Sequence, residues 1–278
     1  MSSKRNIALR LSALGSALLA ALTLAACNGD DQDISLAGSS TSSSGTAAGI
    51  WTGIDSATGL SMIGYVDAGG QADFILANGV QYVGTAQVAG GTLAMTLDGY
   101  PQFGAAFSDG STYGVGTFNG TVVPTSSISG TLSFTTSDDT STSSTWSLTF
   151  NSLYDTAGTL SAISGNYTDN TGATDSGLDP LSGASITISS NGAVYGQGSS
   201  NGCVLNGTLS NANASYDVYQ LSYNYADCTG SYAVLNGVAF TGLANFNSSA
   251  SPGSVTMAVT AQTSSGVYYG VVLGLNGT

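Results

Sequence analysis

The chain has almost no positive charge. Its 278 residues contain no His and no Glu, and the only basic residues are Lys4, Arg5 and Arg10. Nucleic-acid phosphates are held by Lys and Arg, so the sequence beyond residue 10 argues against nucleic-acid binding. Catalytic mechanisms and zinc sites that depend on His are excluded in the same way. All 16 acidic residues are Asp, so the body of the protein is strongly anionic.

Charged residues and proline are also scarce. Charged residues make up 7% of the chain and Pro occurs 4 times, whereas 42% is hydrophobic and Gly occurs 39 times. This composition fits neither a charge-rich disordered chain nor a collagen-like repeat, and the 3 Cys do not make a disulfide-dense scaffold. It predicts one or two globular domains.

The first 26 residues have the pattern of an export signal. Three basic residues precede an apolar stretch from Leu11 to Leu24, which small residues follow. At about 15 residues the stretch is shorter than the roughly 20 residues that a membrane-spanning helix needs. We therefore expect residues 1–26 to be a signal peptide that is removed.

The end of this segment, Leu24-Ala25-Ala26-Cys27, resembles the lipobox of bacterial lipoproteins. The resemblance covers this segment alone and implies cleavage before Cys27, a diacylglyceryl group on its thiol, and acylation of the new amino group, typically with palmitate. Residue 28 is Asn and not Asp, which by analogy with enterobacterial sorting implies the outer membrane. The alternative is an ordinary cleaved signal that happens to precede a Cys.

Residues 27–48 form the expected lipidated Cys and a tether. From Asn28 onward this segment is rich in Ser, Gly and Asp and has no aromatic residue, so it cannot bury enough apolar area to fold. Anionic headgroups repel an acidic domain, so acyl chains, and not the protein surface, would supply the membrane attachment.

From Gly49 onward the sequence predicts an all-β, antiparallel fold. Apolar residues alternate with polar ones, for example at Leu93, Met95 and Leu97 and at Val255, Met257 and Val259. Asn-Gly pairs favour tight hairpin turns because both residues tolerate positive φ. Such pairs start, among other positions, at Asn78, Asn119, Asn191, Asn201, Asn206 and Asn236, and several of them are expected to mark tight turns.

The body is expected to consist of two similar halves, residues 49–160 and 161–278. Gly69, Asn78, Gly79, Gly84, Thr85 and Gly130 recur at an offset of 123 residues. Each half is long enough for a meander that closes into a small barrel or packs as a sandwich, and closure removes exposed sheet edges. The opening Gly49-Ile50-Trp51 is similar to the start of lipocalin-like barrels. A membrane-spanning barrel is the rival architecture, but its strands would need an apolar outer band.

With Cys27 assigned to lipid, Cys203 and Cys228 remain as an even pair in an oxidising compartment. We expect them to form a structural disulfide in the second half. The alternative, two free redox-active thiols, lacks a Cys-x-x-Cys spacing.

The loop that contains Asp169, Asn170, Asp175 and Asp179 is the best candidate metal site in the sequence. Its oxygen ligands and glycines suit weakly bound Ca²⁺, although the spacing departs from the EF-hand pattern. An ordinary turn is the alternative, because Asp and Asn are common turn residues. No other cofactor is expected.

Tyr219, Tyr223 and Tyr225 form an aromatic strand that is a candidate ligand-binding surface. Tyrosine rings can stack on sugars or contact a partner, since each has an apolar face and a polar tip. The same three residues could instead pack inside the fold.

These features predict an outer-membrane-anchored lipoprotein that presents a β-rich binding or structural module at the cell envelope. Its partner would be an envelope protein or a glycan, and we expect no enzymatic activity. A module for glycans, Ca²⁺-bridged partners or toxins is one alternative. An Asp-only glycosidase is another, which would need two carboxylates about 5–10 Å apart across a groove.

Overall fold

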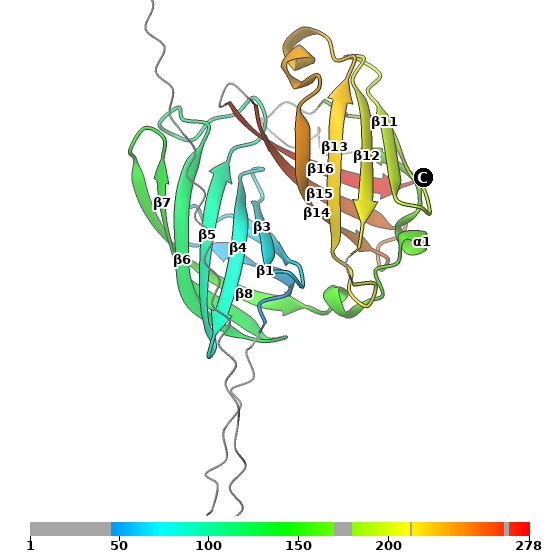
Figure 1. Cartoon of the computed structure of the whole chain (residues 1–278). Coiled ribbons are helices and arrows are strands. Elements are labelled where there is room, and N and C mark those ends of the chain that lie inside the picture. Colours follow the sequence, from blue (N-terminus) through cyan, green and yellow to red (C-terminus); the bar gives the residue numbers. More distant parts are fainter. Residues whose placement is uncertain (1–45, 170–179, 212, 264–266) are drawn as a thin grey trace, which may run out of the picture. The chain divides into compact units, whose positions relative to one another are not determined.

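The computed structural model describes residues 46–169, 180–211, 213–263 and 267–278, and it confirms the all-β fold (Figure 1). Two antiparallel sheets of eight strands each close into barrels. The first is a simple meander in which each strand pairs with the next and the last pairs with the first. Its strands are β1 (Gly49–Asp55), β2 (Ser61–Val66), β3 (Gln71–Leu76), β4 (Gln81–Ala89), β5 (Thr92–Tyr100), β6 (Gly114–Val123), β7 (Ser127–Thr136) and β8 (Ser141–Asn151).

The second barrel has the same order, and its first strand pairs with its last. Its strands are β9 (Gly165–Asp169), β10 (Ser185–Ile188), β11 (Ala193–Gln197), β12 (Val204–Ser210), β13 (Tyr219–Ala226), β14 (Ala239–Asn247), β15 (Ser254–Gln262) and β16 (Tyr268–Gly277). Short helices η1 (Ser152–Asp155) and α1 (Leu160–Ile163) connect the barrels, and η3 (Gly230–Leu235) lies between β13 and β14. Within the described part of the chain, no helix has the length and apolar character needed to cross a membrane.

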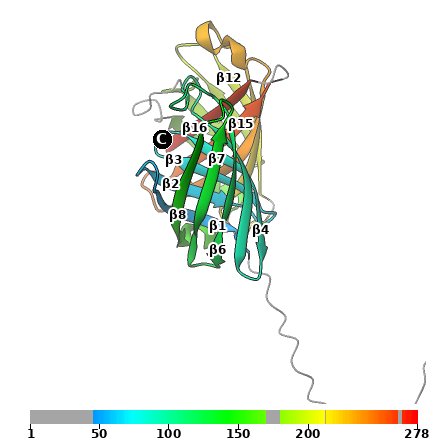
Figure 2. The ribbon, with the colours of Figure 1, turned by 90° about the vertical axis from the view of Figure 1, so that its left-hand side faces the viewer.

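Alternation of buried and exposed residues is clearest on β5, β6 and β8 of the first barrel. On β8 the side chains of Ser144, Trp146 and Leu148 are buried, and the hydroxyl residues between them are exposed. Figure 2 shows β8 beside β7, and β7 pairs on its other edge with β6. A membrane-spanning barrel needs an apolar outer band, and the outer face of β8 has the opposite polarity.

The Asn-Gly pairs divide into turns and strand positions. Gly79, Gly192, Gly202 and Gly237 have positive φ and follow an Asn in a turn or a connection, as predicted. Asn119-Gly120 and Asn206-Gly207 do not form turns, since both pairs lie inside strands. A Cβ atom at Gly120 would come within 2.2 Å of the Ser129 carbonyl oxygen, so glycine is needed there for close strand approach.

The two halves are similar, as predicted, and one local feature recurs in both. Trp51 on β1 donates its indole N–H to the Ala47 carbonyl oxygen at 2.9 Å, and Tyr167 on β9 donates its hydroxyl to the Ile163 carbonyl oxygen at 2.6 Å. Both bonds therefore reach back four residues from the first strand of a barrel.

The single offset of 123 residues, however, holds only in part. Gly70, which precedes β3, corresponds to Gly192, which precedes β11, so the proposed match of Gly69 with Gly192 is wrong. Gly130 lies within β7 whereas Gly253 precedes β15, so that match is wrong too. The strands and connections differ in length between the barrels, and no constant offset can survive that difference.

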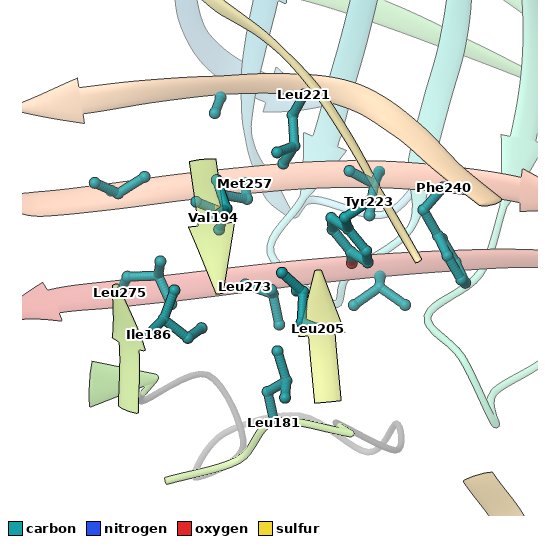
Figure 3. Close-up of a cluster of buried hydrophobic side chains, with 14 of the residues drawn as sticks. Leu181, Ile186, Val194, Leu205, Leu221, Tyr223, Phe240, Met257, Leu273 and Leu275 are labelled. Atoms are coloured by element: carbon teal, nitrogen blue, oxygen red, sulfur yellow. The ribbon is translucent and has the colours of Figure 1, made fainter. Parts of the chain in front are cut away.

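A filled apolar interior holds the second barrel together. Figure 3 shows Leu205, Tyr223, Phe240 and Met257 converging from four strands. All four are at most 3% exposed. Burial at about 25 cal/mol per Å² of apolar area makes this interior the main stabilising term of the second barrel.

The predicted disulfide is present. Cys203 and Cys228 are bonded across a separation of 25 residues. Closing a loop of that length stabilises the fold by about 3.5 kcal/mol in the chain-entropy account.

The two barrels belong to one compact unit and contact each other through outward-facing residues. An apolar cluster joins Ile50, Tyr65 and Ile75 of the first barrel to Leu243 and Ala258 of the second. Hydrogen bonds between the barrels accompany this apolar cluster. Tyr65 donates its hydroxyl to Asn245 at 2.8 Å, and the amide of Gln220 donates to Asp67 at 2.9 Å.

Asp73 on β3 is buried on this outward face. Its exposed fraction is 0%, and among the described residues neither carboxyl oxygen has a hydrogen-bond partner. Removal from water disfavours the charged form, so burial raises the pKa of Asp73 to about 8. Burial also raises the pKa of Asp217, which interacts with Tyr65 at the same contact, to about 7.

The pKa values of Asp73 and Asp217 are raised in the folded chain, so we expect the free energy of unfolding to fall as the pH rises. Below about pH 4 both carboxyls are protonated in the folded and unfolded chains. Above that pH the unfolded chain ionises, whereas Asp73 in the folded chain resists ionisation up to about pH 8. The free energy of unfolding should therefore decrease by up to about 1.4 kcal/mol per pH unit for each group.

Urea denaturation across this pH range tests the effect. Asp73→Asn should make the decrease shallower, while Asp138→Asn, at an exposed position, should leave the wild-type slope. Equal slopes for Asp73→Asn and wild type would contradict the assignment.

Candidate functional site: a pocket at the mouth of the first barrel

The first barrel has a pocket at one open end. In an antiparallel meander alternate connections meet at the same end, and the β1–β2, β3–β4, β5–β6 and β7–β8 connections all contribute lining residues. Its volume is about 350 Å³, within the range of small-molecule sites. We call it the mouth pocket and describe it by six lining residues: Asp55, Tyr82, Phe107, Phe134, Thr142 and Ser144.

Aromatic rings form one wall of the mouth pocket. The centroids of Tyr82 and Phe134 are 5.3 Å apart with nearly perpendicular planes, and Phe107 is also 5.3 Å from Phe134. Tyr82 is 5.7 Å from Trp146, which lies deeper in the barrel and is fully buried. This wall is rigid, because β4, β7 and β8 hold three of the four rings.

The pocket lining also contains a buried carboxylate, that of Asp55. Asp55 ends β1 and is 2% exposed. One oxygen accepts the backbone N–H and the hydroxyl of Thr58, at 2.9 and 2.8 Å. The other accepts the Ser144 hydroxyl at 2.5 Å and the Trp146 indole N–H at 2.9 Å.

These four bonds decide the protonation state of Asp55. Burial alone would raise the pKa of the carboxyl, but the four donors outweigh burial and hold the pKa below its ordinary value. Asp55 is thus a fixed negative charge next to an apolar wall.

A second carboxylate lies near the rim. Asp109 accepts hydrogen bonds from Thr136, which lines the pocket, and from the hydroxyl and backbone N–H of Ser111. The Thr136 and Ser111 donors hold the pKa of Asp109 well below its usual range. Both carboxylates at the mouth are therefore ionised at neutral pH.

The β5–β6 connection links the mouth pocket to the second barrel. Phe107 in this connection packs on Phe134, and Phe103, four residues earlier, packs into the core cluster of the second barrel. The ring centroids of Phe103 and Tyr269 are 5.2 Å apart, and the backbone N–H of Phe103 donates to the Gly270 carbonyl oxygen at 2.8 Å. One segment thus lines the pocket and contacts both barrels.

The tyrosines predicted as a ligand surface lie elsewhere. Tyr219, Tyr223 and Tyr225 are 0%, 3% and 0% exposed, and they point into the second barrel. Tyr223 and Tyr225 share a hydrogen bond of 3.1 Å between their hydroxyls. The structure therefore places them in the core, which is the second interpretation that their pattern allowed.

The other predicted site residues are only partly within the structure. Asp169 lies at the end of β9 with its side chain buried. Asn170, Asp175, Asp179 and the lipidation residue Cys27 lie outside the described residues. Among the described residues, no group of three or more His, Cys, Asp or Glu side chains is placed to hold a metal ion.

The sequence analysis did not identify the mouth pocket. One signal was present, since Asp55 and Thr58 flank a turn with the spacing of an Asp-capped loop. The bonds to Ser144 and Trp146 span 89 and 91 residues, and only the closure of β8 onto β1 brings them together.

Removing the carboxylate should destabilise the first barrel. Asp55→Ala leaves the buried donors of Trp146 and Ser144 unpaired, and we expect a loss of about 3 kcal/mol in the free energy of unfolding. Asp138→Ala, at an exposed turn position, should cost less than about 0.5 kcal/mol. Urea denaturation followed by tryptophan fluorescence measures both, and unchanged stability of Asp55→Ala would refute the role given to this carboxylate.

Comparison with known proteins gives no family. No family model matches the chain, and no curated protein matches it.

Proposed function

We propose that this chain is an outer-membrane lipoprotein whose first barrel binds a small amphipathic ligand at its mouth. The observation that carries the binding role is the mouth pocket, about 350 Å³ in volume, with an aromatic wall and hydroxyl groups at its rim. Ligand sites in barrels commonly occupy the mouth, with mostly apolar linings and a few polar groups that orient the ligand.

The anchoring role rests on the sequence. The segment Leu24-Ala25-Ala26-Cys27 resembles a lipobox, and the residues that follow it have the composition of a tether. Two or three acyl chains on Cys27 would hold the protein firmly at the membrane, since each buried CH₂ contributes about 0.8 kcal/mol. The tether would then present the barrels to ligands at the cell envelope.

The pocket does not favour the glycosidase alternative. Glycoside hydrolysis needs one carboxylic acid with a raised pKa to protonate the leaving group. The pKa values of Asp55 and Asp109, the carboxylates at the mouth, are both lowered. Two permanently ionised groups suit electrostatic recognition better than proton transfer. Recognition of an envelope protein, a toxin or a glycan, with or without Ca²⁺, would involve other surfaces and remains compatible with this proposal.

The anchor is tested by changing the lipidated residue. Cys27→Ala should abolish lipidation, so the protein should leave the membrane fraction and lose incorporation of labelled palmitate. Cys203→Ser, which removes a thiol of the disulfide, is the matched control and should stay with the membrane. Membrane retention of Cys27→Ala equal to that of wild type would contradict the anchor.

The pocket is tested with a neutral fluorescent probe, N-phenylnaphthylamine, and two variants of one strand. Thr142 on β8 lines the mouth, whereas Thr145 on β8 is exposed on the outer face. Thr142→Trp should fill the mouth and weaken probe binding by at least about tenfold, the effect of losing roughly 1.4 kcal/mol of contact. Thr145→Trp should bind the probe as wild type does.

The outcome that would contradict the binding role is equally clear. Either absence of probe binding to the wild type, or equal binding by Thr142→Trp and wild type, would show that the mouth pocket is not a ligand site.

A further inference from the structure

The mouth pocket combines an aromatic wall with a negative charge, whereas an ordinary apolar ligand site has no charge in its lining. One wall is made of the clustered rings of Tyr82, Phe107 and Phe134, and the carboxylate of Asp55 is part of the same lining. Aromatic faces carry a negative quadrupole, so rings and carboxylate both favour positive charge.

Among the residues that the structure describes, no cationic side chain is present to neutralise this site. The only basic residues of the whole chain are Lys4, Arg5 and Arg10, which precede the expected cleavage site before Cys27. Asp109 near the rim adds a second negative charge. Anionic ligands such as fatty acids would therefore be repelled, and neutral ligands would gain no attraction from the negative charge.

The hydrogen bonds of Asp55 narrow the ligand class further. A carboxylate has about four lone-pair sites, and Thr58, Ser144 and Trp146 already donate four hydrogen bonds to it. Asp55 therefore has no free acceptor position for an N–H group and acts on a ligand through its charge. A primary ammonium would lose hydrogen bonds to water that the pocket does not replace, whereas a quaternary ammonium has no N–H to satisfy.

From these contacts we infer that the mouth pocket selects a quaternary ammonium group attached to a small organic body. This inference rests on the proposed ligand-binding function and specifies its ligand class. Tyr82, Phe107 and Phe134 supply the aromatic contacts to the cation, and Asp55 in the same lining supplies the negative charge. Cation–π contact contributes about 0.5–2 kcal/mol, which is roughly 2- to 30-fold in affinity.

The test uses two probes of nearly equal shape on the full wild-type chain. Choline carries a quaternary nitrogen, and 3,3-dimethylbutan-1-ol carries a neutral carbon in its place. Each displaces bound N-phenylnaphthylamine from the protein. We expect choline to displace the dye at a concentration at least about fivefold lower than the alcohol.

Two variants show whether the preference comes from the pocket. Asp55→Asn should reduce the preference to less than about twofold, whereas Asp138→Asn, which removes an exposed carboxylate, should retain it. Isothermal titration of choline into Thr142→Trp should give no binding, which distinguishes the pocket from attraction to an acidic surface. The comparison on the wild type stands even if Asp55→Asn folds poorly.

Failure of this inference differs from failure of the proposed function. If the dye binds the wild type and Thr142→Trp blocks it, but the alcohol displaces it as well as choline does, the pocket binds ligands and the cation selectivity is refuted. A preference for choline that Thr142→Trp does not alter also refutes it. If no probe binds, the proposed function itself is wrong.

Discussion

The absence of cations governs how this protein deals with buried acid groups. In most proteins a buried Asp is paired with Lys or Arg, but beyond residue 10 this chain has neither. The chain's own groups can then stabilise a buried carboxylate only by donating neutral hydrogen bonds to it, and without such donors burial favours its protonated form. Asp55 and Asp73 show the two solutions within one barrel. Four neutral donors keep Asp55 ionised, and burial without donors keeps Asp73 protonated.

Asp55 and Asp73 differ in protonation state, and only the ionised Asp55 can attract a charged ligand. A protonated Asp73 between the barrels carries no charge and serves the packing of one barrel on the other. An ionised Asp55 at the mouth carries a charge that nothing in the described part of the chain neutralises. Aromatic rings line the same pocket, so a ligand there meets both a charge and an apolar wall.

The β5–β6 connection gives the two barrels a shared part. Phe103 packs into the core cluster of the second barrel, and Phe107, four residues later, lines the mouth pocket of the first. The second barrel has a packed core of its own, and its disulfide adds to the rigidity of the support that it gives this segment.

The sequence predicted the fold much better than the site. Alternation at Leu93, Met95 and Leu97 fixed which face of a strand is buried, and the even pair Cys203 and Cys228 predicted a bond. The alternation is a local signal, and the disulfide follows from the number of Cys residues that remain after Cys27. The pocket depends on barrel closure, which brings residue 55 to residue 146, and no periodicity encodes that contact.

Glycine was the least reliable local signal. Asn-Gly predicts a turn through positive φ, but Gly120 is required instead by the carbonyl oxygen of a neighbouring strand. The three tyrosines of β13 were ambiguous for a similar reason, because an aromatic stripe suits a barrel interior as well as an open surface.

The most direct test of this account is a pH titration of the Asp side-chain carboxyl carbons by carbon-detected NMR. The account predicts that Asp55 titrates below the ordinary Asp range and that Asp73 titrates near pH 8. A protonated Asp55 at neutral pH, or an Asp73 that titrates in the ordinary range near pH 4, would contradict it.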